Sequence, residues 1–155
     1  MISENASFET LAVHAGQAPE AETGALVAPV FMTSTYVFTP EKMERYLAGD
    51  KAGIFTYGRS RNPTQNALQQ KIAALEGAPA ALAVASGMAA VSLAILNCAR
   101  HGDHIVSCHT VYGGTHALIT KVLNEFGIDC TFVPKMTAEE LDKAVTSAKD
   151  RKSVV

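Results

Sequence analysis

The chain has 155 residues, of which 48% are hydrophobic and 18% are charged, and its 13 basic and 15 acidic side chains give a formal charge of −2. This composition is typical of a globular chain that buries a core, and the near-neutral charge gives no electrostatic reason to expect nucleic acid or an anionic membrane as a partner. No run of about 18 apolar residues predicts a membrane span, and no basic and apolar leader opens the chain. We therefore expect the partner to be a small molecule or a second copy of the chain.

The first 60 residues show little hydrophobic periodicity and are interrupted by glycine and proline. This part of the sequence predicts an extended arm with one short helix over residues 40–48, which Thr39 would cap. An arm of this length without a core of its own is expected to lie against another surface.

From residue 62 onward the pattern becomes regular. Asn62, Pro63 and Gln65 have the spacing of a capped helix start with a capping box, and Gly77 is expected to end this helix. Residues 81–85 predict a short strand that turns through Ser86 and Gly87 into a second helix, which extends to about residue 99. This helix is apolar nearly all round, so we expect it to be buried.

The same alternation continues to the end of the sequence. Strands are predicted over residues 104–108 and 128–133, and a helix from Gly113 to about residue 126 would connect them. Thr137 opens a capping box before a helix that would turn Leu141 and Val145 inward, and a further strand begins at residues 153–155. Strands and helices alternating at this spacing predict a parallel α/β sheet. Because a parallel sheet is covered on both faces, we expect the sequence to be part of a longer protein.

Cysteine and histidine residues give no metal-binding pattern. The three cysteines are odd in number and lack CxxC spacing, so we expect reduced, buried thiols in a cytoplasmic protein. The histidines and Cys108 match no common zinc spacing, and no metal site is predicted. The residues concerned are Cys98, Cys108, Cys130, His101, His104, His109 and His116.

Three segments carry residues suited to binding a phosphorylated ligand. At the start of the second predicted helix, the backbone amides of Gly87 and Met88 could bind phosphate, although this segment alone favours an ordinary turn capped by Ser86 with nothing bound. Tyr57 and Arg59 could add a hydroxyl and a bidentate cation to such a site, or could belong to a solvated basic loop. No G-x-G-x-x-G or G-x-x-x-x-G-K-[ST] motif occurs, which argues against a dinucleotide or nucleoside triphosphate site.

Tyr112 directly follows the strand predicted over residues 104–108. A tyrosine at the carboxyl end of a parallel strand could stack on a flat cofactor ring, or could be an aromatic residue at the edge of the core beside a glycine turn.

In their order along the chain, six segments resemble the Cys/Met metabolism family of pyridoxal-phosphate (PLP) enzymes. The segments are residues 11–16 (LAVHAG), 28–35 (APVFMTST), 57–64 (YGRSRNPT), 75–77 (LEG), 85–88 (ASGM) and 111–115 (VYGGT). The resemblance implies an α/β fold of the type I PLP aminotransferase-like class, a mostly parallel sheet with flanking helices. Residues 1–60 would form an N-terminal arm contacting the neighbouring subunit, and residues 61–155 would form the first part of the PLP-binding large domain.

The resemblance also implies roles for single residues. Tyr57 and Arg59 would reach the phosphate of the PLP bound by the neighbouring subunit, within a homotetramer built from two dimers. The amides of Gly87 and Met88 would bind the phosphate of the PLP in their own subunit, and Tyr112 would stack on its ring and assist proton transfer.

The activity implied is a PLP-dependent lyase or transferase reaction of methionine and cysteine metabolism. Members catalyse γ-elimination or γ-replacement on sulfur amino acids or O-acylhomoserine, as cystathionine γ-synthase, cystathionine γ-lyase, methionine γ-lyase and O-acetylhomoserine sulfhydrylase do. The family's cofactor-binding lysine lies further along the chain, so we expect these 155 residues alone to be inactive. The lysines that do not match its motif are Lys121, Lys135, Lys143 and Lys149.

Two other interpretations remain open at this point. The chain could be a non-catalytic truncated module that acts through self-association. It could also be an α/β protein that binds phosphate or a nucleotide without relation to PLP enzymes, although the absent glycine motifs disfavour this interpretation.

Overall fold

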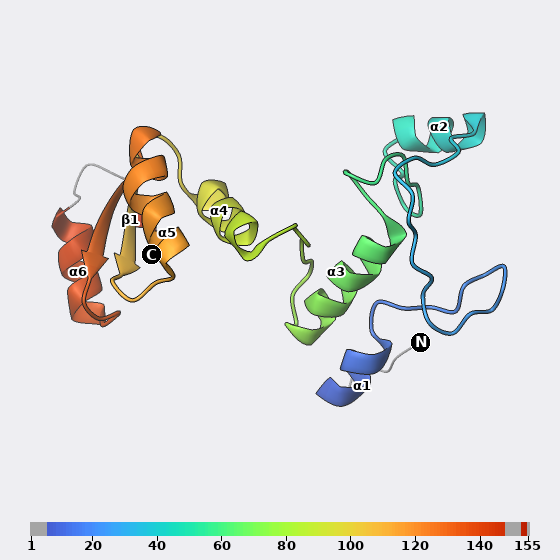
Figure 1. Ribbon diagram of the computed structural model, residues 1–155, viewed down its shortest axis with the longest axis horizontal. Helices are drawn as coiled ribbons and strands as arrows, with labels where there is room; N and C mark the ends of the chain where they lie inside the picture. The colour runs from blue at the N-terminus through green and yellow to red at the C-terminus, as the bar shows by residue number, and fades with distance from the viewer. Residues whose placement is uncertain (1–5, 148–152, 155) are drawn as a thin grey trace. The chain divides into compact units, whose positions relative to one another are not determined.

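A computed structural model describes residues 6–147 and 153–154 of the chain (Figure 1). The chain divides into two compact units, Met1–Ala83 and Val84–Val155, and each is described by itself. Among the described residues, no helix combines the length and the apolar character needed to cross a bilayer.

The first unit contains three helices: α1 (Phe8–His14), α2 (Pro40–Leu47) and α3 (Pro63–Leu75). The predicted helix after Thr39 is confirmed as α2, and Thr39 Oγ1 accepts a hydrogen bond from the Lys42 amide at 3.3 Å. The prediction of only one helix before residue 60 is wrong, because α1 also forms. Its signal was a cap at Ser7, whose Oγ accepts the Thr10 amide at 3.4 Å, together with an acidic residue, Glu9, in the first turn.

Gly16 allows α1 to lie against α3. Its φ of 71° is in the left-handed region, and a β-carbon built there would lie 2.4 Å from the carbonyl oxygen of Ala67 on α3. From α3, Lys71 Nζ donates hydrogen bonds to the carbonyl oxygens of Ala12 and Val13, both at 3.0 Å. These contacts place a lysine ammonium at the carboxyl end of α1, where the helix dipole favours a positive charge.

Helix α3 begins as predicted, with Asn62 Oδ1 accepting the Thr64 amide at 2.8 Å. The predicted capping-box role of Gln65 is wrong, because Gln65 Nε2 donates to the Ala83 carbonyl oxygen at 2.9 Å. Gln69 Oε1 accepts the Ala83 amide at 3.0 Å, so two side-chain amides satisfy this backbone position. The strand predicted over residues 81–85 is therefore also wrong: the segment forms no strand, and side chains of α3 take the place of a neighbouring strand.

The second unit contains a three-stranded parallel sheet in the order β2-β1-β3. The strands are β1 (His104–Cys108), β2 (Asp129–Val133) and β3 (Ser153–Val154). Ile105 of the central strand pairs with Cys130 on one side and with Val154 on the other. The parallel sheet and its three strands are confirmed. Val155, the last residue of the third predicted strand, and Lys149, one of the lysines that do not match the family's motif, lie outside the described residues.

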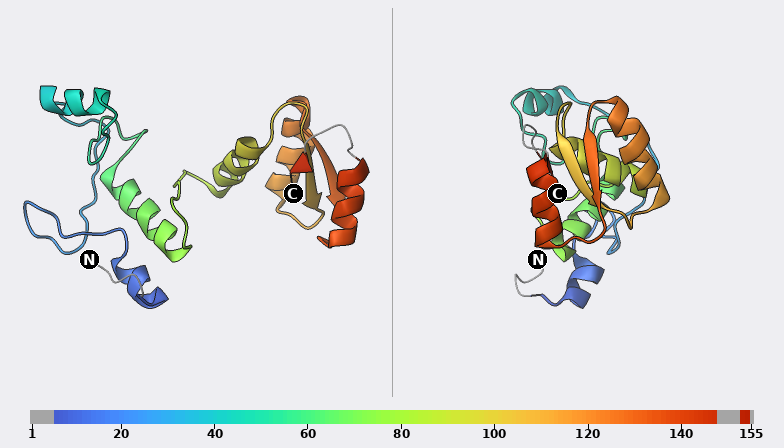
Figure 2. Two further views of the ribbon diagram at one scale, coloured as in Figure 1. Left: turned by 180° about the vertical axis from the view of Figure 1, so that it is seen from behind. Right: turned by 90° about the vertical axis from the view of Figure 1, so that its left-hand side faces the viewer.

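Helices cover the two faces of this sheet. The connection from β1 to β2 consists of α5 (Gly113–Ala117) and the π-helical segment η1 (Leu118–Leu123), and α6 (Ala138–Ser147) follows β2. Successive side chains of a strand point to opposite faces, and accordingly Ile105 packs with η1 whereas Val106 packs with α6. Figure 2 shows the two helical segments on opposite sides of the strands.

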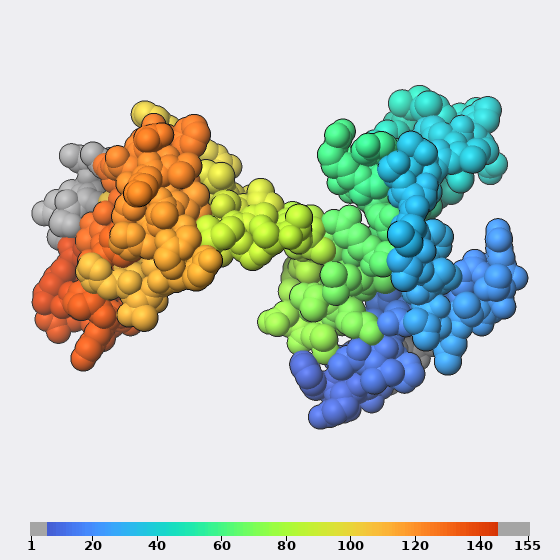
Figure 3. Space-filling model, in the orientation of Figure 1, coloured from blue at the N-terminus to red at the C-terminus, as the bar shows by residue number. Residues whose placement is uncertain are grey.

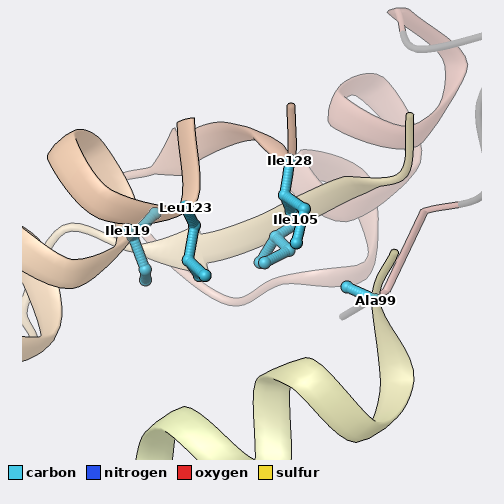
Figure 4. Close-up of a cluster of buried hydrophobic side chains, with 5 residues drawn as sticks. All are labelled: Ala99, Ile105, Ile119, Leu123 and Ile128. Carbon is cyan, nitrogen blue, oxygen red and sulfur yellow. The ribbon is translucent and has the colours of Figure 1, made fainter. Parts of the chain in front are cut away.

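Two clusters of buried side chains result. The larger cluster lies under η1 and includes Leu123, which is 1% exposed (Figure 4). In the smaller cluster, Leu141 packs against the buried Ala144, so its inward position is confirmed. The inward position of Val145 is wrong: this side chain is 40% exposed, because the face of α6 that meets the sheet passes through residues 141 and 144. The larger cluster is formed by Ala99, Ile105, Ile119, Leu123 and Ile128.

Helix α4 (Gly87–Cys98) forms where the sequence predicts it but is not buried. Leu93 and Leu96 are 47% and 43% exposed, and α4 is visible at the surface in yellow-green in Figure 3. An apolar hollow of about 350 Å³ is lined by Ile95 of α4, Ile105 of β1 and Ile119 of η1, among others. The prediction that α4 is helical is therefore confirmed, and the prediction that it is buried is wrong. Burial of an apolar helix also requires a surface that covers it, and the described residues provide none over Leu93 and Leu96.

None of the three cysteines, all of which are described, forms a disulfide. The expectation that they are buried is wrong, because Cys98 is exposed and Cys108 and Cys130 are only half-buried. Burial nevertheless raises the pKa of the Cys130 thiol to about 11. The neutral thiol is favoured there because partial removal from water penalises the thiolate.

Alkylation should report this protection of Cys130. At pH 9 the raised pKa leaves roughly fiftyfold less thiolate than an ordinary cysteine has, so iodoacetamide should modify Cys130 slowly in the folded chain. The rate can be followed at each cysteine by peptide mass spectrometry, with the urea-unfolded chain as the control. Equal rates for Cys130 in the folded and the unfolded chain would contradict the prediction.

Candidate functional site

The amino end of α4 presents two free backbone amides. Ser86 Oγ accepts the Ala89 amide at 3.1 Å, and the Ser86 carbonyl oxygen accepts the Ala90 amide at 3.1 Å. The amides of Gly87 and Met88 belong to the first turn and therefore have no partner within the helix. A β-carbon built on Gly87 would meet no atom within 4 Å among the described residues, so the space beside the Gly87 α-carbon is open. The positive end of the helix dipole favours an anion there.

Tyr112 lies in the loop after β1, as the sequence predicts, and is 74% exposed. Its ring lies against Gly114: a β-carbon built on Gly114 would be 2.7 Å from Tyr112 Cε1 and 3.1 Å from Met88 Sδ. Thr115 Oγ1 also donates to Met88 Sδ at 3.8 Å. The structure therefore brings together Met88 and Tyr112, two of the residues singled out in the sequence.

The topology of the second unit explains why these residues meet. Helix α4 precedes β1, so its amino end lies at the carboxyl edge of the sheet, from which the Tyr112 loop also leaves. The chain leaves β1 towards α5 and η1 on one face, and leaves β2 towards α6 on the other face. In the strand order β2-β1-β3 the direction of the chain across the sheet reverses after β2, and open α/β sheets bind ligands beyond the carboxyl ends of their strands at such a switch point.

Three stacked rings that the sequence did not predict, those of His109, Phe132 and His116, lie at the same edge. Phe132 stacks on His109 with ring centroids 5.5 Å apart, and on His116 with centroids 5.0 Å apart. These histidines therefore pack against an aromatic ring, and no group of three or more metal-ligating side chains occurs in the part of the chain that the structure describes. Thr115 was also not singled out individually, although it belongs to the VYGGT segment.

In the first unit, Tyr57 and Arg59 are brought together. The guanidinium carbon of Arg59 lies 5.1 Å from the centroid of the Tyr57 ring, within the range of a cation–π contact. Arg59 has no ion-pair partner among the described residues, whereas Arg61 donates to the Lys51 carbonyl oxygen at 2.8 Å. Neither arginine has an acidic partner among the described residues, but the Arg59 guanidinium also makes no hydrogen bond there, a feature suited to an anionic ligand.

The Tyr57 loop is held by the preceding part of the arm. Gly58 donates its amide to the Ser34 carbonyl oxygen at 2.7 Å, beside an antiparallel bridge between Thr35 and Tyr57. Asn62 Nδ2 donates to the Phe31 carbonyl oxygen at 2.9 Å. These bonds join the APVFMTST and YGRSRNPT segments into one structural element of the first unit.

Comparisons with known proteins all find enzymes of cysteine and methionine metabolism. Residues 9–154 match the family described as Cys/Met metabolism PLP-dependent enzyme. The chain is 41% identical to the homocysteine/cysteine synthase of Saccharomyces cerevisiae over 88% of this chain and 31% of that protein. It is also 41% identical to the L-methionine gamma-lyase of Porphyromonas gingivalis, over 89% of this chain and 34% of that protein.

The fold has the same relatives. The structure of metY from Campylobacter jejuni subsp. jejuni, solved with N′-pyridoxyl-lysine-5′-monophosphate, is 30% identical and superposes with a TM-score of 0.79. The match covers 90% of this chain and 34% of that one, so the type I fold class is confirmed for the segment described. The chain spans about a third of the length of the curated relatives it matches.

Proposed function

Because the chain belongs to the Cys/Met metabolism family of PLP-dependent enzymes, we propose that it forms the N-terminal part of an enzyme acting by γ-elimination or γ-replacement. The substrate is a sulfur amino acid or an O-acylhomoserine, in keeping with similar proteins named as a synthase and a γ-lyase. The observation that carries this proposal is the pair of free amides at the start of α4, with Tyr112 beside the same turn.

The amino end of α4 fits the phosphate of the family's cofactor. Gly87 and Met88 would donate their backbone amides to phosphate oxygens, and the absence of a side chain at Gly87 would let the phosphate come close to the backbone. When bound, PLP supplies an electron sink for the substrate's bonding electrons, and the protein supplies binding, orientation and proton transfer.

Tyr112 would contribute its ring and its hydroxyl. Its 74% exposure leaves the aromatic face open to a flat partner, and its phenol can donate or accept a proton at the hydroxyl oxygen. A tyrosine so placed would both orient the cofactor ring and move a proton to or from the substrate.

Tyr57 and Arg59 would act on a second copy of the chain, at the phosphate of the neighbouring subunit's cofactor. Residues 1–60 would form the contacting arm, and residues 61–155 the first part of the large domain, in an assembly of two dimers. Exposed apolar side chains in the arm support this assignment: Met32 is 94% exposed and Val37 is 80% exposed. Side chains of this kind are commonly covered in an assembly.

We also propose that these 155 residues alone are inactive and that the protein is cytoplasmic. No lysine among these 155 residues matches the family's cofactor-binding motif, so we expect this chain alone to give no turnover. The three cysteines form no disulfide, in keeping with a reducing, cytoplasmic environment. The similar proteins bear enzyme names, and no observation favours a non-catalytic module instead.

Replacing Gly87 by proline tests the amide site directly. Proline is well suited to the first position of a helix and follows Ser86 readily, because Ser86 is extended with ψ of 158°. The Gly87→Pro substitution therefore removes one amide donor and keeps the helix. We expect inorganic phosphate and PLP to bind at least about tenfold more weakly, since a charge-assisted hydrogen bond is lost.

Binding can be measured by NMR titration of the 155-residue chain, following the Met88 amide. Gly87→Ala is the matched control, because it keeps the amide while adding a methyl group in open space, and it should bind more tightly than Gly87→Pro. Equal affinities of the proline and alanine variants would show that the Gly87 amide is not a phosphate ligand.

A further inference from the structure

Two adjacent glycines open α5, and they differ in their surroundings. A β-carbon built on Gly113 would meet nothing within 4 Å. A β-carbon built on Gly114 would lie 2.7 Å from Cε1 and 3.2 Å from Cδ1 of Tyr112, and 3.1 Å from Sδ of Met88. Only Gly114 thus occupies a position where the missing side chain makes room for two neighbours.

The contact with Gly114 restrains a ring that has few other restraints. Tyr112 is 74% exposed, and as the residue before α5 it makes no side-chain capping hydrogen bond. A β-carbon at residue 114 would overlap one edge of this ring, the Cδ1–Cε1 bond, and would also press on the Met88 thioether.

The Met88 side chain is the less yielding of the two neighbours. Its sulfur accepts a hydrogen bond from Thr115 Oγ1 at 3.8 Å, whereas the Tyr112 side chain is 74% exposed. Any β-carbon at residue 114 would therefore be accommodated mainly by rotation of the Tyr112 ring towards solvent. This rotation would move the phenol hydroxyl, which lies at the far end of the ring.

We propose that Gly114 is a positioning residue for Tyr112: it sets where the tyrosine ring and hydroxyl stand relative to the phosphate site at the start of α4. The inference rests on the proposed function for its catalytic meaning, while the geometric claim stands on this chain alone. Residue 114 touches neither cofactor nor substrate in this assignment and acts only through the ring of Tyr112.

The geometric claim can be tested with the 155-residue chain carrying ¹³C-methyl methionine. The Tyr112 ring current should shift the methyl resonance of Met88, and Tyr112→Leu should remove this shift. We expect Gly114→Ala to move the resonance in the same direction as Tyr112→Leu, and the matched variant Gly113→Ala to leave it unchanged. Met136, in the loop before α6, provides an internal reference in the same spectrum.

Two results would overturn the proposal: a Met88 resonance unmoved by Gly114→Ala, or one moved as much by Gly113→Ala. If Gly114→Ala unfolds the second unit, stability supplies the test. The clash partner is absent after Tyr112→Ala, so adding Gly114→Ala to that variant should cause much less destabilisation than in the wild-type chain. Equal destabilisation in the two backgrounds would also overturn the proposal.

Ligand titration separates this inference from the proposed function. Gly114→Ala should weaken PLP binding by about two- to tenfold through the lost ring contact, and should leave the affinity for inorganic phosphate unchanged. Equal weakening for both ligands would contradict a role through Tyr112. If the wild-type chain binds neither ligand, the proposed phosphate site fails, while the methyl resonances still decide whether Gly114 positions the ring.

Discussion

Replacing Leu123 by alanine is expected to destabilise the second unit by about 3 kcal/mol. Leu123 is 1% exposed and lies in the larger cluster with Ile105, Ile119 and Ile128 (Figure 4). Removing its isobutyl group loses the transfer free energy of the buried atoms and leaves a cavity that a close-packed cluster fills only in part. Hydrogen exchange of the β1 amides measures the loss, because these bonds open only when the sheet opens.

Val122 supplies the control for this substitution. It precedes Leu123 on η1 but is 44% exposed, so Val122→Ala should change the free energy of opening by less than about 0.5 kcal/mol. Similar losses for Val122→Ala and Leu123→Ala would mean that η1 is not packed on the sheet as described.

Replacing Gly16 by alanine is expected to detach α1 from α3 at a loss of about 3 kcal/mol. Gly16 has a φ of 71°, which a residue with a side chain adopts at a cost of about 1 kcal/mol. The β-carbon would also lie 2.4 Å from the carbonyl oxygen of Ala67 and 2.7 Å from the amide of Lys71. Both atoms belong to the backbone of α3, so the overlap is relieved only by moving a helix.

A Gly24→Ala variant separates the dihedral cost from the cost of the overlap with α3. The φ of Gly24 is also 71°, but a β-carbon there would meet nothing within 4 Å among the described residues. Gly24→Ala should therefore show only the dihedral cost, and the difference between the two variants measures the contact with α3. Protection of the Ala15 amide, which donates to the Leu11 carbonyl oxygen, provides the readout. If the two variants lose equal protection, the close approach of Gly16 to α3 is refuted.

Local signals in the sequence were sufficient for the elements whose stability is local. Thr39, Asn62 and Thr137 each accept an amide of the first helical turn, so the starts of α2, α3 and α6 could be read directly. The parallel sheet followed from alternation of strands and helices. The start of α1 carried the same kind of signal at Ser7, and it was missed because the surrounding residues lack periodicity.

The two wrong predictions about residues 81–85 and about the burial of α4 have a common physical cause: each depends on which other segment packs beside the one predicted. Residues 81–85 have a strand-like composition, but a strand also needs a ladder partner, and Gln65 and Gln69 satisfy Ala83 instead. An apolar helix such as α4 is buried only where another surface covers it. Neither neighbour can be read from the segment itself.

In the candidate site, too, the features set by local sequence were predictable and the contacts set by packing were not. The cap at Ser86 and the place of Tyr112 after a strand were predictable from local pattern, and the family resemblance gave them roles. The contact among Tyr112, Gly114 and Met88 was not predictable, because it depends on how α4 meets the loop after β1. Whether Tyr57 and Arg59 act across subunits stays a prediction.

The exposed apolar surface of α4 has a consequence for the order of events during folding. The sheet pairs β1 with β2 across a single helical crossover, so the loop closed is short and the entropy lost in closing it is small. Helix α4 has no such early partner, and its leucines stay in water until some other surface reaches them. In a growing polypeptide, α4 is therefore a segment prone to aggregation, and one that a chaperone would protect.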